Sequence, residues 1–174
     1  MTYDEPRGVL LTGRLGVGKS TLAIETFAVL AEADLPAAAL DLDWLAWARP
    51  HPPTLTTIED LLEENLRAMR PVYAGAGIRF YVLARAVSHA HEVEAIRRAL
   101  GVPLQVARVT ADPALAEVRI RARDTGAELA TNLADRHSFG DAIHEDFTID
   151  NGDRPIRDVA LELLDRLGWT RMVR

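Results

Sequence analysis

Cysteine is absent from the 174-residue sequence, and lysine occurs once, at Lys19, among 20 lysine and arginine residues. Without cysteine the chain can form no disulfide, no thiolate nucleophile and no cysteine-ligated zinc or iron–sulfur site. No apolar run is long enough to span a bilayer, and the first segment, MTYDEPRGVL, is charged and has no apolar targeting core. These absences predict a cytoplasmic protein without a membrane partner.

The charge balance narrows the function further. The net charge of -6 argues against a protein devoted to nucleic-acid backbones or anionic membranes. Hydrophobic residues make up 48% of the sequence and charged residues 26%, which is ordinary for a globular protein. At this length we expect one α/β domain over residues 1–174.

Short apolar segments alternate with longer amphipathic ones along the chain. The apolar segments predict strands at 8–13, 37–43, 78–84, 104–110 and 147–150. Helix signals occur between and after them, with Thr57 and Asp112 as expected N-caps and Gly101 and Gly168 as expected stops. This alternation predicts a three-layer α/β fold with a five-stranded parallel sheet and helices on both faces.

A glycine-rich segment follows the first predicted strand. It matches the phosphate-binding P-loop pattern at all four fixed positions, Gly13, Gly18, Lys19 and Ser20. The variable positions between them are Arg14, Leu15, Gly16 and Val17, and Thr21 follows. The glycines allow a tight turn whose N–H groups converge on phosphate oxygens, and the next helix adds the positive end of its dipole. Lys19 can reach the β- and γ-phosphates, and the Ser20 hydroxyl can ligate Mg²⁺. We therefore predict that residues 13–21 bind a nucleotide.

The single lysine supports this interpretation. The sequence uses arginine at every other cationic position, yet keeps lysine where a compact ammonium group fits among phosphates. With its one lysine inside the P-loop, the chain has no guanine-reading Asn-Lys-x-Asp motif, so it is not a switch GTPase. The strand at 78–84 leads into Arg85 in place of a Walker B acid, and the acids Asp41 and Asp43 end the second predicted strand.

With these features the chain resembles the small P-loop kinases of metabolites, the group of shikimate kinase, gluconate kinase, adenylylsulfate kinase and chloramphenicol phosphotransferase. The resemblance covers the whole chain as a pattern of elements, and the P-loop is its specific motif. It implies a P-loop NTPase fold with strand order 2-3-1-4-5, and ATP and Mg²⁺ as cofactors. It also implies a short lid at about 119–132 and an acceptor-side segment at about 43–75.

The resemblance assigns roles to the acidic pair. In shikimate-kinase-like members an Asp-x-Asp ends the second strand, where one acid helps to hold Mg²⁺ and the other meets the acceptor hydroxyl. Asp41 is thereby assigned to the metal with Ser20, and Asp43 to the acceptor. Alternation along a strand would point both carboxylates to one side. The alternative is that these strand-end acids cap a helix.

Arginines and a polar loop complete the expected site. Arg119 and Arg123 are four residues apart and share a helical face, whereas Arg121 points elsewhere. By the resemblance, Arg119 stacks on adenine and Arg123 neutralises the transferred phosphoryl group; the alternative is a solvated arginine-rich helix. The loop after the last strand occupies the place that wraps adenine in this family, with residues Asn151, Gly152, Arg154 and Pro155.

The acceptor end is less specified. Trp44 and Trp47 either stack on an aromatic or sugar acceptor or pack against the core. Four arginines are possible anchors for an anionic acceptor: Arg49, Arg67, Arg70 and Arg79. The lid lacks the arginine-proline pair of shikimate kinases, which leaves the acceptor open among sugars, cyclic acids, antibiotics and nucleosides.

Together these features predict a kinase that transfers the γ-phosphoryl group of ATP, with Mg²⁺, to a hydroxyl of a small molecule. Lys19, Asp43 and Arg123 are its expected catalytic residues. The alternative is an ATP-binding regulatory or accessory P-loop protein without a phosphoryl acceptor. A third hypothesis, a polynucleotide-end kinase, is disfavoured by the net charge and by a length suited to one domain.

Overall fold

The structure, a computed structural model, describes residues 5–48, 57–135 and 143–170. Its strands are β1 (Arg7–Thr12), β2 (Ala37–Asp41), β3 (Phe80–Ala84), β4 (Leu104–Thr110) and β5 (Phe147–Asp150). Seven helices lie in the described residues: α1 (Lys19–Glu32), α2 (Leu42–Leu45), α3 (Ile58–Gly75), α4 (Ala90–Leu100), α5 (Pro113–Arg123), α6 (Gly126–Asp135) and α7 (Ile156–Arg166). In these residues, no helix has both the length and the apolar character that crossing a membrane requires.

The five strands form one parallel sheet in the order β2-β3-β1-β4-β5, as predicted. Strand β1 is central and pairs with β3 on one side and β4 on the other. All five residues of β3 are buried. A strand needs apolar residues at every position when both faces of its sheet are covered, which explains the continuous apolar runs in the sequence.

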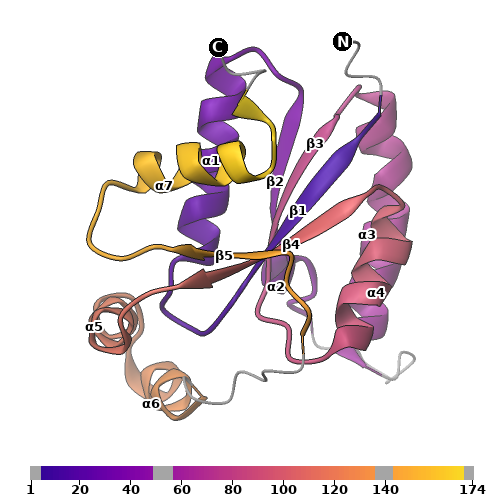
Figure 1. The fold of residues 1–174 in the computed structure, drawn as a ribbon. Helices are drawn as coiled ribbons and strands as arrows, with labels where there is room; N and C mark the ends of the chain where they lie inside the picture. Colours follow the sequence, from indigo (N-terminus) through magenta and orange to yellow (C-terminus); the bar gives the residue numbers. More distant parts are fainter. Residues whose placement is uncertain (1–4, 49–56, 136–142, 171–174) are drawn as a thin grey trace.

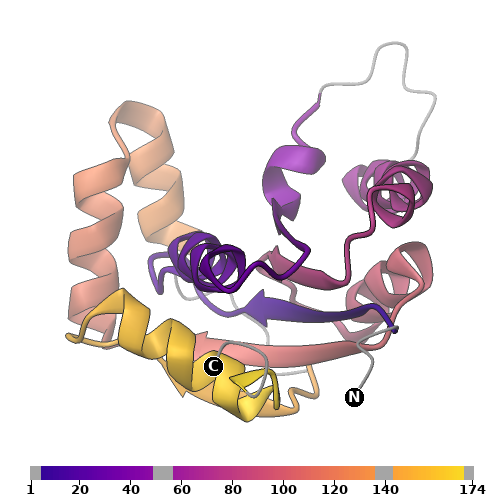
Figure 2. The ribbon, with the colours of Figure 1, turned by 90° about the horizontal axis from the view of Figure 1, so that it is seen from above.

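Helices cover both faces of the sheet (Figures 1 and 2). Helices α1 and α7 pack together on one face, and α3 and α4 on the other. The side chains of β1 alternate between the two cores: Val9 and Leu11 pack toward α1 and α7, and Leu10 packs toward α3 and α4. The pairing of β1 with β3 and β4 sets the register of the central strand, and with it the position of the loop that follows Thr12.

Three strand boundaries and the form of the expected lid differ from the prediction. Strand β1 is Arg7–Thr12 rather than 8–13, and β3 begins at Phe80 rather than at residue 78. Strand β2 ends at Asp41 rather than at residue 43, because the Asp41 side chain caps α2 by accepting a hydrogen bond from the Asp43 N–H at 3.1 Å. The expected lid is a pair of helices, α5 and α6, which stands beside the sheet in Figure 2. The chain turns between them at Gly126, whose φ is +58°.

The predicted caps are confirmed. Thr57 accepts a hydrogen bond from the Asp60 N–H at 3.0 Å at the start of α3, and Asp112 caps α5 with Pro113 in the first turn. Gly101 follows α4 in the left-handed conformation. Because all five strands are parallel, the loops that follow them lie at one edge of the sheet, where α/β folds bind ligands.

Candidate active site

The glycine-rich loop between β1 and α1 has the backbone conformation that its sequence requires. Gly16 and Gly18 have φ values of +78° and +88°. A Cβ atom at Gly16 would collide with the Ala116 carbonyl oxygen, and one at Gly18 with the Asn151 side-chain amide. Neither position can hold a side chain, so the loop packs closely against α5 and against the loop after β5.

Lys19 begins α1, and its side chain is buried. Its ammonium group donates to the carbonyl oxygens of Gly13 at 2.9 Å and Arg14 at 3.0 Å. Burial lowers the pKa of Lys19 from 10.5 to about 8; Asp43 and Asp41 oppose this shift and Arg123 adds to it. The ammonium is therefore kept among backbone oxygens at a position where phosphate charge would stabilise it.

Ser20 and Asp41, the two residues assigned to the metal, lie together. The Ser20 hydroxyl donates to Asp41 Oδ2 at 2.6 Å across the loop and the end of β2. A hydroxyl and a carboxylate are hard oxygen ligands, which suits Mg²⁺, an ion that keeps several waters and takes its other ligands from phosphates. Among the described residues no group of three or more His, Cys, Asp or Glu side chains forms a metal site of its own. This oxygen pair thus fits an ion that arrives with a nucleotide.

Asp43 lines the same cleft, but from a helix rather than from the strand that the sequence predicted. The alternation argument was wrong, because Asp43 lies in the first turn of α2 and not on a strand. The carboxylate nevertheless faces the cleft with Asp41. Partial burial raises the pKa of Asp43, Arg85 opposes that rise, Asp41 adds to it and Lys19 lowers it. Asp41 caps α2 and also accepts a hydrogen bond from Ser20 in the cleft. The capping alternative is therefore correct for Asp41, and it does not exclude a position in the cleft.

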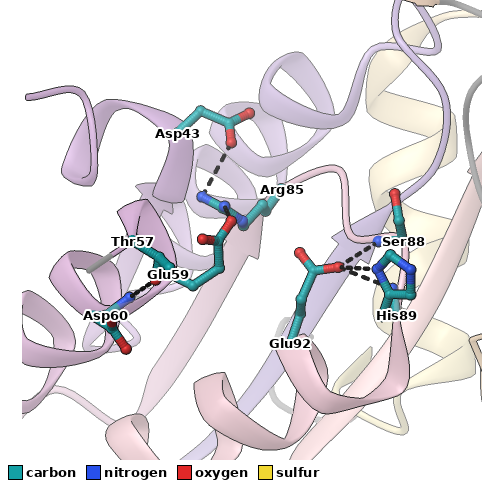
Figure 3. Close-up of polar contacts among 8 residues, drawn as sticks. All are labelled: Asp43, Thr57, Glu59, Asp60, Arg85, Ser88, His89 and Glu92. Atoms are coloured by element: carbon teal, nitrogen blue, oxygen red, sulfur yellow. Dashed lines mark hydrogen bonds and ion pairs between the residues drawn. The ribbon is translucent and has the colours of Figure 1, made fainter.

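Arg85 is a cleft residue that sequence reasoning missed. It directly follows β3, and 9% of its side chain is exposed. One guanidinium nitrogen lies 3.4 Å from Asp43 Oδ1 and the other 3.7 Å from Glu59 Oε1. Figure 3 shows Arg85 between these two carboxylates. The sequence did contain a signal for this position. Arg85 directly follows a run of five strand residues that are all buried, so it lies at the sheet edge that binds ligands.

The arginines of α5 divide as predicted. Arg119 lines the cleft and donates to the carbonyl oxygens of Asn151 at 3.0 Å and Gly152 at 3.2 Å. Arg123 also lines the cleft and pairs with the buried carboxylate of Asp124, which raises the pKa of Arg123 and lowers that of Asp124. Arg121 pairs with Glu117 outside the cleft. The solvated-helix alternative therefore describes Arg121, and Arg123 combines a cleft position with a side chain that is 60% exposed.

The loop after β5 is tied to the phosphate loop. Asn151 is buried, and its side-chain amide donates to the Val17 carbonyl oxygen at 2.7 Å. Asn151 and Arg154 line the cleft; Gly152 contributes a carbonyl to Arg119, and Pro155 precedes α7 without lining the cleft.

Within the phosphate loop the cleft-lining residues are Leu15, Gly16, Gly18, Lys19, Ser20 and Thr21, whereas Gly13, Arg14 and Val17 are not among them.

These groups surround one cleft of about 1120 Å³. This exceeds the roughly 300–1,000 Å³ of a typical small-molecule pocket. We call the part lined by the phosphate loop, α5, α6 and Asn151 the nucleotide end. The opposite part, lined by Asp43, Trp44, Trp47, Ile58 and Arg85, is called the acceptor end. Figure 2 shows that α5 and α6 lie on one side of α1 and that α2 and α3 lie on the other.

Three of the four arginines expected to anchor an anionic acceptor do not line this cleft. Arg67 pairs with Glu63 and Glu64 on the surface of α3. The Arg70 guanidinium lies beside Gly101, and Arg79 precedes β3 at the opposite edge of the sheet. Arg49 lies outside the described residues.

No family model matches the sequence, and a search of curated proteins finds no significant match. Solved structures do match. A sugar kinase from Janibacter sp. HTCC2649 has a TM-score of 0.63 at 18% identity, over 97% of this chain and 98% of that one. The fold is that of the P-loop small-molecule kinases.

Two further structures with this kinase fold agree. An APS kinase from Mycobacterium tuberculosis, solved with AMPPNP and APS, has a TM-score of 0.63 at 22% identity, over 94% of this chain and 98% of that one. Shikimate kinase from Bacteroides thetaiotaomicron has a TM-score of 0.60 at 17% identity, over 92% of this chain and 98% of that one. At these identities the likeness establishes the kinase fold, including the predicted strand order.

Proposed function

We propose that this protein is an ATP- and Mg²⁺-dependent phosphotransferase that acts on a hydroxyl group of a small molecule. The observation that carries the proposal is the two-ended cleft. Phosphate-binding groups gather at one end, and an acid faces the cleft at the other. A protein that only binds ATP has no use for the acceptor end, whereas a kinase needs both ends to open into the same space.

The residues at the nucleotide end bind and orient the donor. The loop N–H groups and the N-terminus of α1 face the phosphates. Lys19 exchanges its bonds to Gly13 and Arg14 for bonds to the β- and γ-phosphates, and its charge is then fully neutralised. Arg119 places its guanidinium face against the base, and Arg123 approaches the γ-phosphate. Ser20, whose hydroxyl contacts Asp41, would hold Mg²⁺, which would supply charge neutralisation of the phosphates.

Asp43 acts at the acceptor end. Its carboxylate accepts the proton of the acceptor hydroxyl as that oxygen forms a bond to the γ-phosphorus. The bond between the γ-phosphorus and the bridging oxygen breaks, and ADP leaves with that oxygen. Arg85 keeps the carboxylate ionised and holds its position, as Figure 3 shows. Catalysis in this class is mainly positioning and electrostatic stabilisation, which this set of residues can supply.

The test is direct. Purified protein is incubated with Mg²⁺ and ATP against a panel of hydroxyl compounds, and ADP release is followed together with new phosphate-ester signals in the ³¹P spectrum. Lys19→Ala should abolish transfer, and Arg121→Ala, which alters an arginine outside the cleft, is the matched control. Tight ATP binding without an ester product from any compound would instead favour the accessory-protein alternative.

A further inference from the structure

Asn151 joins three segments that are far apart in the sequence. Its backbone N–H donates to the Thr110 carbonyl oxygen at the end of β4 at 2.7 Å, and its own carbonyl oxygen accepts from Arg119 of α5 at 3.0 Å. Its side-chain amide donates to the Val17 carbonyl oxygen of the phosphate loop at 2.7 Å. Strand β4 and helix α5 thus hold the backbone of Asn151, while its side chain reaches the phosphate loop.

The side chain of Asn151 packs closely against this loop. The resemblance to small P-loop kinases places Asn151 in the segment that wraps adenine, but the residue is only 3% exposed. A Cβ atom at Gly18 would lie 2.4 Å from its amide nitrogen. The amide therefore lies directly against the backbone of the phosphate loop, which points to a role at the phosphates rather than at the base.

The peptide between Val17 and Gly18 is the group that this contact orients. In a planar trans peptide the carbonyl and the N–H point in opposite directions. Because the Val17 carbonyl points to Asn151, the Gly18 N–H points away from it. Gly18 lines the cleft and is the N-cap of α1, where backbone N–H groups have no partner within the helix. The Gly18 N–H is therefore placed to donate to a phosphate oxygen.

Glycine alone does not keep this peptide in one orientation. Gly18 has a φ of +88°, and glycine adopts negative φ values about as readily. A peptide turned the other way would direct the Val17 carbonyl oxygen at the phosphates and remove one donor. It would also leave the buried amide of Asn151 without this acceptor, which is unfavourable. The hydrogen bond from Asn151 thus stabilises the orientation that suits an anion.

We propose that Asn151 is a positioning residue for the nucleotide phosphates, which holds the Val17–Gly18 peptide so that the Gly18 N–H faces them. The proposal rests on the nucleotide binding that is part of the function proposed above, and it does not depend on the identity of the acceptor. It assigns Asn151 to the phosphates, in place of the role at adenine that the resemblance implies.

The first experiment observes this one peptide. Val17-Gly18 is the only Val-Gly step in the sequence, so labelling with [1-¹³C]valine and [¹⁵N]glycine gives a single cross-peak in an HNCO spectrum. Mg²⁺ and ADP should move the Gly18 amide proton downfield, because it forms a hydrogen bond to phosphate. In Asn151→Ala the Val17 carbonyl signal should move upfield, and the proton shift caused by ADP should be much smaller. This variant keeps both backbone hydrogen bonds of residue 151.

The second experiment separates the phosphates from the base. Calorimetry gives the Kd of ATP and of inorganic tripolyphosphate, both with Mg²⁺. Asn151→Ala should weaken both by the same factor, about 2- to 10-fold, the effect of one neutral hydrogen bond. Thr26→Val is the matched control, because it removes a buried 2.7 Å bond to the Leu22 carbonyl in α1, outside the cleft. It should lower the urea midpoint and leave both Kd values unchanged.

Several results would overturn the proposal. A Gly18 proton that does not move when ADP binds to the natural protein would do so without any variant. Weaker ATP binding with unchanged tripolyphosphate binding would return Asn151 to the base, and an equal loss in Thr26→Val would make the effect one of general stability. Neither experiment uses an acceptor, so a panel without any phosphorylated compound would count against the phosphotransferase and leave this proposal standing. Absence of both ATP and tripolyphosphate binding would overturn both.

Discussion

Replacing Lys19 by methionine should stabilise the nucleotide-free protein while weakening its hold on ATP. Burial lowers the pKa of Lys19 from 10.5 to about 8, a difference of 2.5 units. At 1.36 kcal/mol per unit, keeping this ammonium charged at pH 7 costs the folded state about 3 kcal/mol. Methionine fills similar space without the charge. It gives up the two hydrogen bonds to Gly13 and Arg14, each contributing about 1 kcal/mol, so the net gain is about 1 kcal/mol.

The pH dependence identifies the cause. Because folding lowers the pKa, the unfolded chain binds more protons than the folded one between pH 8 and pH 10.5, and stability rises with pH in that window. The advantage of Lys19→Met should therefore be constant below pH 8, then shrink and reverse by pH 10.5. Urea unfolding of both proteins without nucleotide, from pH 7 to pH 10.5, measures this. Ile24→Met, on the exposed side of the same helix, is the control.

ATP should reverse the order of stability. Loss of a charged hydrogen bond to phosphate, at about 1.5–3 kcal/mol, weakens ATP binding by about 10- to 100-fold. At pH 7 and saturating ATP the natural protein should gain more stability than the variant. A difference between the two proteins that does not vary between pH 8 and pH 10 would refute the buried-charge argument. Undiminished ATP affinity in the variant would remove Lys19 from the phosphate site.

Three further predictions concern the cleft. Asp43→Asn should keep its ATP affinity by calorimetry and lose about 10²–10⁴-fold in turnover, the usual range for a general base; full turnover would remove that role. Asp41→Asn loses the negative charge and one of the two oxygens that accept from Ser20 and from the Asp43 N–H, and it should need more Mg²⁺ for half-maximal activity, with partial recovery at high Mg²⁺. An unchanged Mg²⁺ titration would make Asp41 a helix cap only. Hydrogen exchange in α5 and α6 should slow when an ATP analogue and an acceptor bind, and equal exchange in both states would mean that these helices are not a lid.

The sheet and the phosphate loop were predictable because each depends on a local pattern. The run FYVLA of β3 is apolar at every position and is buried at every position. The phosphate loop has a fixed glycine spacing that follows from backbone geometry. The strand order came from the resemblance, and solved kinase structures agree with it.

The acceptor end was less predictable because its contacts join distant segments. Helix α2 has four residues, which are too few to show a helical pattern of apolar residues. The polar-apolar alternation of Asp41-Leu42-Asp43 is typical of a strand, and the sequence was therefore interpreted as one. The sequence predicts a short lid here but not its two helices, because the hydrogen bond from the Asn132 amide to Asp124 joins residues on either side of the turn at Gly126. The contact of Arg85 with Asp43 could not be predicted, because the two residues are 42 positions apart in the sequence.

The order in which the strands occur has a consequence for the growing chain. Strand β1 is made first, yet its two neighbours begin at Phe80 and Leu104, and Asn151, which fastens the phosphate loop, follows Val17 by 134 positions. A ribosome-bound chain therefore displays an apolar strand with both edges unpaired through much of its synthesis, which is the kind of segment that chaperones protect. ATP can stabilise only chains in which the segment after β5 has reached the phosphate loop. Nucleotide should therefore increase the refolding yield of the full-length protein but should not stabilise shorter fragments held on the ribosome.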